Sequence, residues 1–291
     1  MFRIGTIRSG EKRVAVVEAG GEVYDLSSVL GQPVASLDAL FDEWDANLDR
    51  IAGALESGSH APVDIAAATF DCPIASPRKV ICIGINYRDH IDEMSVDAPE
   101  FPYAFLRPPS CLTGHGADVV LPDGPNMIDW EAELGVVVGK RARGLSPDNA
   151  LEAVAGYTVI NDISARDWIE SAPFVGVDWV MQKAWDGFQP TGPWLVPARF
   201  VEQPQALAIK LSVNGVVKQD QTTANMVFSV AEILVHLSRI MTLEAGDLIA
   251  TGTPSGVGFG RKPREFLQNG DEVTVSIEGL GELRNRFRRA C

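Results

Sequence analysis

Residues 128–138 constrain this chain more than any other stretch, because apolar and acidic side chains alternate along them. They read Ile-Asp-Trp-Glu-Ala-Glu-Leu-Gly-Val-Val-Val. Successive side chains of a β-strand point to opposite faces, so the pattern predicts a strand with one face in a hydrophobic core. The other face carries Asp129, Glu131 and Glu133. Taken alone, the pattern is also typical of an amphipathic strand whose acidic face lies in solvent.

Three of the acids in this region have the chemistry of a metal site. Glu131 and Glu133 are two residues apart on one strand face, which places their backbones roughly 7 Å from each other. A third acid, Asp162, stands at the end of another predicted strand, residues 156–162. No His-x-His or Cys cluster accompanies them, and oxygen ligands favour Mg²⁺, Mn²⁺ or Ca²⁺ over zinc. The sequence therefore predicts a site for a hard divalent cation.

Predicted strands outnumber predicted helices over the rest of the chain. Residues 1–30 alternate around Gly20-Gly21, which indicates an antiparallel meander, and residues 36–57 have helical spacing. We predict a small N-terminal α/β domain at 1–75 and a mainly β (α+β) domain at 76–291, with a few helices at its edge. Further predicted elements are a strand at 80–84, strands at 208–213 and 216–218 joined by Asn214-Gly215, a helix at 228–241, and strands at 248–250, 273–277 and 283–287.

Charge and composition exclude some classes of function. The net charge is −14 and no stripe of Lys and Arg runs along the sequence, so we expect no nucleic-acid partner. No apolar run is long enough to span a bilayer, so we expect no membrane partner. The four cysteines lack C-x-x-C spacing, which is typical of reduced thiols, and Met1 leads directly into strand-like residues rather than a signal peptide. We therefore expect a cytoplasmic protein.

Two further motifs leave alternatives open. His90 and Glu93 are three residues apart, so in a helix they share a face and can form a hydrogen bond. The same segment could be an exposed, charged helical turn. The glycine-rich loop 251–260 lacks the Gly-Lys-Ser/Thr ending of a phosphate-binding P-loop. Its glycines permit close approach of a ligand, or they make a tight structural turn.

Four ordered motifs together resemble the fumarylacetoacetate hydrolase (FAH) family, over roughly residues 78–290. They are Gly84-x-Asn86-Tyr87-x-Asp89-His90-x-x-Glu93-Met94, Asp129-Trp130-Glu131-x-Glu133-Leu134, Asn161-Asp162-x-Ser164-Ala165-Arg166-Asp167 and Thr251-Gly252-Thr253-Pro254. The resemblance implies the FAH-type mixed β-roll, a homodimer, and a divalent ion on Glu131, Glu133 and Asp162. Mg²⁺ or Mn²⁺ is expected there, with Ca²⁺ as a further candidate.

The resemblance also implies roles for individual residues. It implies a His90–Glu93 pair on a mobile lid, at residues 88–98, and a lysine near the substrate carbonyl, which Lys183 matches. Arg166, Thr253 and Tyr87 match positions that bind substrate. The resemblance thus implies a metal-dependent hydrolase that acts on a small oxo acid. Its reaction would cleave the C–C bond of a 2,4-dioxo acid, such as an acylpyruvate, to pyruvate and a carboxylic acid.

Other functions fit the same motifs. The same metal site could serve an oxaloacetate decarboxylase or a 2-hydroxy-dienoate isomerase, and a member without catalysis could serve as a binding protein. The chain also departs from the family pattern, because Ile169 stands where many members carry glutamine and Trp185 where phenylalanine is usual. The apolar stretch 169–181 predicts a substrate with a hydrophobic tail.

Overall fold

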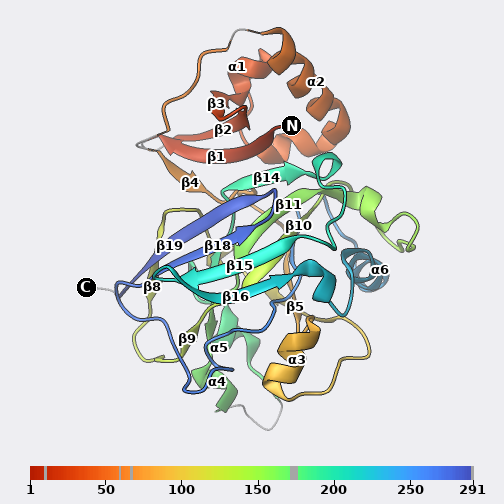
Figure 1. The fold of residues 1–291 in the computed structure, drawn as a ribbon. Coiled ribbons are helices and arrows are strands. Elements are labelled where there is room, and N and C mark those ends of the chain that lie inside the picture. Colours follow the sequence, from red (N-terminus) through yellow and green to blue (C-terminus); the bar gives the residue numbers. More distant parts are fainter. Residues whose placement is uncertain (10–11, 59, 66–67, 171–175, 290–291) are drawn as a thin grey trace.

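The structure is a computed structural model that describes residues 1–9, 12–58, 60–65, 68–170 and 176–289. Its fold is mainly β, as predicted, with two large sheets packed face to face (Figure 1). The larger sheet has ten strands, and β4 (Thr69–Asp71) pairs with β1 beside its main path. Along that path the strands are β3 (Glu22–Asp25), β2 (Lys12–Ala19), β1 (Arg3–Ser9), β14 (Trp194–Pro197), β11 (Val154–Asn161), β10 (Ala132–Val138), β17 (Leu248–Ala250), β5 (Val80–Gly84) and β6 (Tyr103–Arg107).

The second sheet has five strands and lies over one face of the first. Its order is β16 (Val216–Thr222), β15 (Ala208–Val213), β18 (Glu272–Ile277), β19 (Gly281–Arg289) and β8 (Asp118–Leu121). Strands β15, β18 and β19 contact β10 and β11 across the interface. The main hydrophobic core fills this interface, and helix α6 (Val230–Ile240) packs at its edge. Both sheets contain parallel as well as antiparallel pairs, so the roll is mixed.

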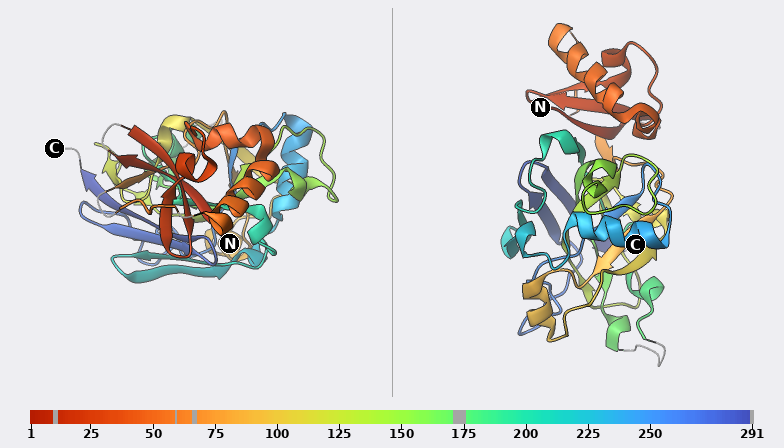
Figure 2. Two further views of the ribbon diagram at one scale, coloured as in Figure 1. Left: turned by 90° about the horizontal axis from the view of Figure 1, so that it is seen from above. Right: turned by 90° about the vertical axis from the view of Figure 1, so that its right-hand side faces the viewer.

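The N-terminal elements extend the larger sheet and cover its other face. Strand β1 pairs with β14 through Ile4 and Leu195, so the predicted meander is continuous with the sheet. A second hydrophobic core joins that face to α1 (Leu26–Leu30), the 3₁₀ helix η1 (Leu37–Glu43) and α2 (Trp44–Ser57). These elements lie at one end of the molecule in Figures 1 and 2. The domain boundary at 75/76 stays a prediction.

The central strand β10 is buried on both faces, which corrects the hypothesis of a solvent-exposed acidic face. The even-numbered residues from Ile128 to Val138 lie in the main core, as the alternation predicts. The odd face is covered as well, because Val137 belongs to the second core and Glu133 is 1% exposed. The stretch is also two strands, since β9 (Ile128–Asp129) pairs with β12 (Ser164–Ala165) rather than with β11.

The other predicted elements are found with small shifts. Asn214 and Gly215 both adopt positive φ, 51° and 76°, which is the backbone of a tight two-residue hairpin. Helix α6 begins after Ser229, whose side chain forms a capping box with Glu232. The helix predicted at 36–57 is divided into η1 and α2.

The end opposite the N-terminal elements carries short helices and irregular loops (Figures 1 and 2). Its elements are α3 (Arg88–Met94), α4 (Asp167–Glu170) and α5 (Trp179–Lys183), with β9 and β12. Strands β7 (Leu112–Thr113) and β13 (Gln189–Pro190) and the 3₁₀ helices η2 (Pro109–Cys111), η3 (Ala150–Ala153), η4 (Ala198–Phe200) and η5 (Thr223–Asn225) complete the chain. Within the described ranges, no helix is both long enough and apolar enough to cross a membrane.

Candidate active site and metal centre

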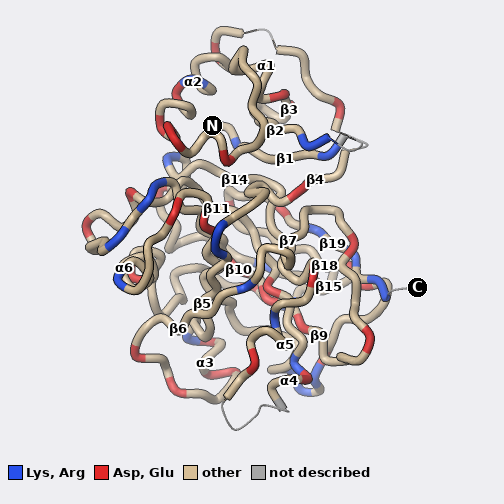
Figure 3. The backbone as a smooth tube through the Cα atoms, turned by 180° about the vertical axis from the view of Figure 1, so that it is seen from behind, with Lys and Arg blue, Asp and Glu red and all other residues tan. Residues whose placement is uncertain are grey.

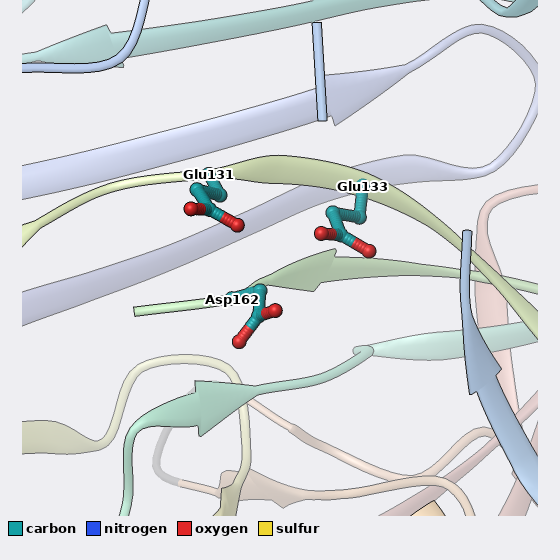
Figure 4. A group of neighbouring side chains, drawn as sticks. All are labelled: Glu131, Glu133 and Asp162. Carbon is teal, nitrogen blue, oxygen red and sulfur yellow. The ribbon is translucent and has the colours of Figure 1, made fainter. Parts of the chain in front are cut away.

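Strand pairing brings the three predicted metal ligands together. Glu133 lies on β10 and Glu131 immediately before it, while Asp162 follows the last residue of β11. Because these strands are antiparallel, with Ala132 opposite Asn161, the end of β11 lies beside the start of β10. Each acid offers an oxygen within 4.8 Å of the others, and all three side chains are buried (Figure 4). The sequence prediction of one shared cation site is consistent with this geometry.

Buried cations surround the carboxylates. Lys183, at the end of α5, donates to Glu131 Oε2 (2.8 Å) and to Asp162 Oδ2 (2.9 Å). Arg166 donates to Glu131 Oε1 (2.5 Å). Arg107, the last residue of β6, donates to Asp162 Oδ1. Acidic and basic segments lie next to one another beside β10 and α5 (Figure 3).

Asp129 is a fourth buried carboxylate next to the three ligands. It accepts a hydrogen bond from Arg166 Nε (3.0 Å) and others from the backbone N–H groups of Gly258 (2.6 Å) and Phe259 (3.0 Å). Burial raises its pKa, and Arg166 opposes that shift. Asp129 therefore ties the glycine-rich loop to the guanidinium that contacts Glu131.

The charges of this cluster leave one carboxylate without a cation. Burial raises the pKa of Glu133 well above its ordinary value, and the nearby Asp162 and Glu131 raise it further. Glu133 accepts from the backbone N–H of Gly252 (2.8 Å) but forms no ion pair with any described residue. For Glu131, burial alone would raise the pKa, but Lys183 and Arg166 lower it to about 2. With four buried carboxyl groups and three buried cations, the cluster has the oxygen donors that fit a divalent ion, and it gains an excess negative charge when Glu133 loses its proton to a bound ion.

The predicted His–Glu pair lies on α3. His90 Nδ1 is 2.9 Å from Glu93 Oε2, and the other carboxylate oxygen of Glu93 accepts from Gly256 N (2.9 Å). Asp89 anchors the same helix, because its Oδ2 accepts from Ser255 Oγ (2.6 Å) and N (3.2 Å). His90 is buried, so the alternative of an exposed helical turn is wrong. Since a carboxylate only accepts hydrogen bonds, Nδ1 is the donor to Glu93, and in the neutral imidazole Nε2 is then the acceptor.

A small cavity of about 60 Å³ joins these groups. Water occupies about 30 Å³ per molecule in the liquid, so the space matches an ion and a few small-molecule atoms rather than a long chain. Its apolar wall includes Phe105 and Trp179, whose rings stack 4.2 Å apart. The lining residues are Ile83, Gly84, Ile85, His90, Phe105, Glu131, Glu133, Asp162, Arg166, Trp179, Lys183 and Thr253.

The loop that follows β17 is shaped to aim a backbone donor at Glu133. Gly252 has φ +96°, and a Cβ at this position would lie 2.7 Å from Cβ of Asn86. Asn86 Nδ2 donates to Thr251 O (2.8 Å), which fixes the start of the loop. Thr253 Oγ1 accepts from Gln219 Nε2 (2.8 Å). Only glycine fits this backbone and this space. Gly252 therefore makes the tight turn possible and also places its N–H against Glu133.

Most predicted site residues meet at the cavity. His90, Lys183, Arg166 and Thr253 line it together with the three acids, and Glu93 lies behind His90. Tyr87 packs instead in the hydrophobic core, fully buried, and its hydroxyl has no hydrogen-bond partner among the described residues. The role of Tyr87 in substrate binding stays a prediction.

Sequence reasoning missed Arg107, Asp129 and Gln219 as parts of the site. Arg107 is the single charged residue of an otherwise apolar strand. A buried arginine requires an acidic partner, so its position could have indicated a buried ion pair. The apolar stretch 169–181 is only partly visible, because residues 171–175 lie outside the described residues. The predicted hydrophobic tail of the substrate therefore stays a prediction.

The known proteins that this chain is similar to include enzymes. Residues 79–288 match the family described as fumarylacetoacetate (FAA) hydrolase C-terminal. Oxaloacetate tautomerase FAHD2A, mitochondrial, of Bos taurus is 39% identical over 268 residues, 92% of this chain and 84% of that protein. The 2,4-didehydro-3-deoxy-L-rhamnonate hydrolase of Sphingomonas sp. (strain SKA58) is 37% identical over 278 residues, 95% of this chain and 92% of that protein.

One similar solved structure contains a metal ion. Maleylpyruvate hydrolase from Sphingobium sp. SYK-6, in complex with manganese(II) ion and pyruvate, is similar with a TM-score of 0.82 and 28% identity. The match covers 99% of this chain and 100% of that one. The relatives thus include a hydrolase with manganese, a sugar-acid hydrolase and a tautomerase.

Proposed function

This chain belongs to the fumarylacetoacetate hydrolase family, and from that premise we propose that it is a divalent-metal-dependent hydrolase of 2,4-dioxo acids. The products would be pyruvate and a carboxylic acid. One observation carries the proposal: His90, backed by Glu93, lines the same small cavity as the three carboxylates and Lys183. A base, a cation site and a fixed ammonium are the parts that such a cleavage needs.

Glu131, Glu133 and Asp162 would hold the ion, for which we propose Mg²⁺ or Mn²⁺. When bound, it supplies Lewis-acid polarisation of the 2-oxo group of the substrate. Support comes from the oxygen-only donor set and from the manganese and pyruvate in the similar maleylpyruvate hydrolase structure.

Lys183 and Arg166 would neutralise the oxo-acid end of the substrate. Both are buried beside the carboxylates, so neither needs to be reoriented or desolvated when an anion enters. Fixed positive charge of this kind stabilises the negative charge that develops on the departing pyruvate more than the charge of the ground state. An anionic substrate could not otherwise approach a cluster of four carboxylates.

His90 would act as the general base. Its Nε2 would take a proton from water while Glu93 holds the proton on Nδ1, and such a role contributes about 10²–10⁴-fold to the rate. The hydroxyl adds to the carbonyl carbon C4, and the C3–C4 bond then breaks. Its electron pair goes to C3, which is protonated to give the methyl group of pyruvate.

A second candidate is keto–enol tautomerisation of a small oxo diacid such as oxaloacetate. The size of the cavity favours it, since about 60 Å³ suits a short substrate, and the Bos taurus relative carries that name. Decarboxylation and isomerisation stay alternatives on the same site. The complete set of base, cations and carboxylates opposes a purely binding role. A homodimer and a cytoplasmic location remain proposals.

Product analysis tests the proposal. The purified protein would be treated with a chelator, reconstituted with Mg²⁺ or Mn²⁺, and offered a panel of acylpyruvates and oxaloacetate. We expect pyruvate and the matching carboxylic acid from an acylpyruvate. An enol converted to its ketone with no change of mass would support the tautomerase, and release of CO₂ would support the decarboxylase.

A further inference from the structure

Each of the three site carboxylates has one oxygen held by a buried donor of this chain. Asp162 Oδ1 accepts from Arg107, which reaches it from the end of β6. Glu131 Oε1 accepts from Arg166 (2.5 Å) and from Ser164 Oγ (3.2 Å). These donors occupy one oxygen of each carboxylate.

The third carboxylate is held in the same way by the backbone. Glu133 Oε2 accepts from the N–H of Gly252, whose positive φ and lack of Cβ fix the direction of that N–H. The second oxygens of Glu131 and Asp162 face the ammonium of Lys183. Among the described residues, none donates a hydrogen bond to the remaining oxygen of Glu133. Each acid would therefore offer one oxygen to an incoming ion. For Glu131 and Asp162 it is the oxygen that the ion would share with the ammonium of Lys183, and for Glu133 it is the oxygen without a described donor.

The donors are fixed in place, so they can keep the carboxylates from turning. The Arg107 side chain is fully buried, and its strand pairs with β5 through Val80. Arg166 is held from its other side by Asp129 (3.0 Å). Rotating either carboxylate to present both oxygens would leave a buried guanidinium without its acceptor, which is strongly unfavourable because the charge would then be buried without a partner.

Ions differ in how they use a carboxylate. Ca²⁺ takes six to eight oxygens and often binds carboxylates through both of them, whereas Mg²⁺ requires a smaller, near-octahedral shell and keeps several waters. We propose that Arg107, Arg166 and Gly252 restrict the three acids to one oxygen each and thereby select Mg²⁺ or Mn²⁺ against Ca²⁺. This inference rests on the proposed metal site and adds to it the residues that decide which ion it takes.

Arg107 is the best residue to test, because it lies behind Asp162 and does not line the cavity. Calorimetric titration of the chelator-treated protein would give the Kd for Mg²⁺ and for Ca²⁺ in wild type, Arg107→Met and Arg107→Lys. Wild type should bind Mg²⁺ more tightly. In Arg107→Met, Oδ1 of Asp162 loses its donor and can join Oδ2 in binding the ion, so the Kd for Ca²⁺ divided by the Kd for Mg²⁺ should fall by about tenfold, or 1.4 kcal/mol.

The ratio of the two Kd values distinguishes a change in carboxylate geometry from a change in charge. Removing a positive charge strengthens the binding of both divalent ions alike, so it does not change their ratio. Arg107→Lys keeps the charge and a donor, and its ratio should stay near that of wild type. Circular dichroism would check folding. If Arg107→Met does not fold, Arg166→Met, which leaves Glu131 Oε1 with only the hydroxyl of Ser164 as its donor, should shift the ratio in the same direction.

The outcomes distinguish a failure of this inference from a failure of the proposed metal site. Binding of neither ion to wild type would overturn the metal site and this inference with it. Binding of Mg²⁺ with an unchanged ratio in the folded Met variant would overturn the inference alone. Tighter binding of Ca²⁺ than Mg²⁺ by wild type would overturn it as well.

Discussion

Lys183 Nζ lies 2.8 Å from Glu131 Oε2, and both side chains are buried. The two residues come from different parts of the chain, since Lys183 ends α5 and Glu131 precedes β10. Burial alone would lower the pKa of Lys183, but Asp162 and Glu131 raise it. The ammonium is therefore charged and fixed beside the oxygens that would bind an ion, where the substrate anion would arrive.

Replacing Lys183 by Met should lower kcat/KM by about 10²–10³-fold, the range found when one charge-stabilising donor is removed. The binding of Mg²⁺ should not weaken, because the variant removes a positive charge beside the ion. Steady-state kinetics with an acylpyruvate and calorimetric titration of Mg²⁺ would measure the two effects. An unchanged kcat/KM would remove Lys183 from the mechanism.

Replacing Glu131 by Ala should abolish the rise in Tm that Mg²⁺ gives the wild-type protein. A ligand that binds only the folded state stabilises it by about 2.7 kcal/mol at a concentration of 100 times Kd. Glu152→Ala is a matched control, because Glu152 is exposed and does not line the cavity. A Glu131→Ala protein whose melt still responds fully to Mg²⁺ would contradict the assigned site.

The binding of Mg²⁺ should release a proton and strengthen as the pH rises. The pKa of Glu133 is raised in the folded protein by burial and by its acidic neighbours, so this carboxyl holds a proton where an exposed glutamate is ionised. The ion must displace that proton. Without metal, the raised pKa favours folding below the ordinary pKa of glutamate, and this contribution is lost as the pH rises through the raised value.

Calorimetry in two buffers of different ionisation enthalpy would count the released protons. Glu133→Gln cannot release a proton and serves as the control. Metal binding by wild type with no dependence on buffer or pH would contradict the raised pKa of Glu133.

His90→Gln should suppress hydrolysis by about 10²–10⁴-fold, the usual contribution of a general base. A decarboxylation of oxaloacetate on the same protein should fall much less, because it requires no activated water. Parallel assays of pyruvate from an acylpyruvate and CO₂ from oxaloacetate would compare them. Equal losses in both reactions would show that His90 serves binding instead.

The grouping of the three acids could be predicted from the sequence because its signal is local. Alternation places Glu131 and Glu133 on one face of a strand, and Asp162 ends the other strand of a neighbouring pair. The residues that cover the acidic face are distant from it in the sequence. Residues 37–57 supply the second core and α5 supplies Lys183, both from distant parts of the chain. The stretch 128–138 taken by itself therefore also fitted a solvent-exposed acidic face, which the fold buries.

The supporting residues could not be predicted for a similar reason. Arg107 contacts Asp162 although β5, β17 and β10 separate their strands in the larger sheet. Gln219 contacts Thr253 because β16 of the second sheet lies beside the glycine-rich loop. The family resemblance predicts a mobile lid at residues 88–98. Its first turns are held by polar contacts of Asp89 and Glu93 with the glycine-rich loop. Its mobility without ligand stays a prediction.

The most direct test of the hydrolase proposal is a reaction in ¹⁸O-labelled water. With Mg²⁺ or Mn²⁺ and an acylpyruvate, mass spectrometry should find one ¹⁸O in the new carboxyl group of the acid product, with pyruvate formed in equal amount. The label should be lost together with activity when the metal is removed. Conversion of oxaloacetate between enol and ketone, with no cleavage of any acylpyruvate offered, would contradict the hydrolase and leave the tautomerase in its place.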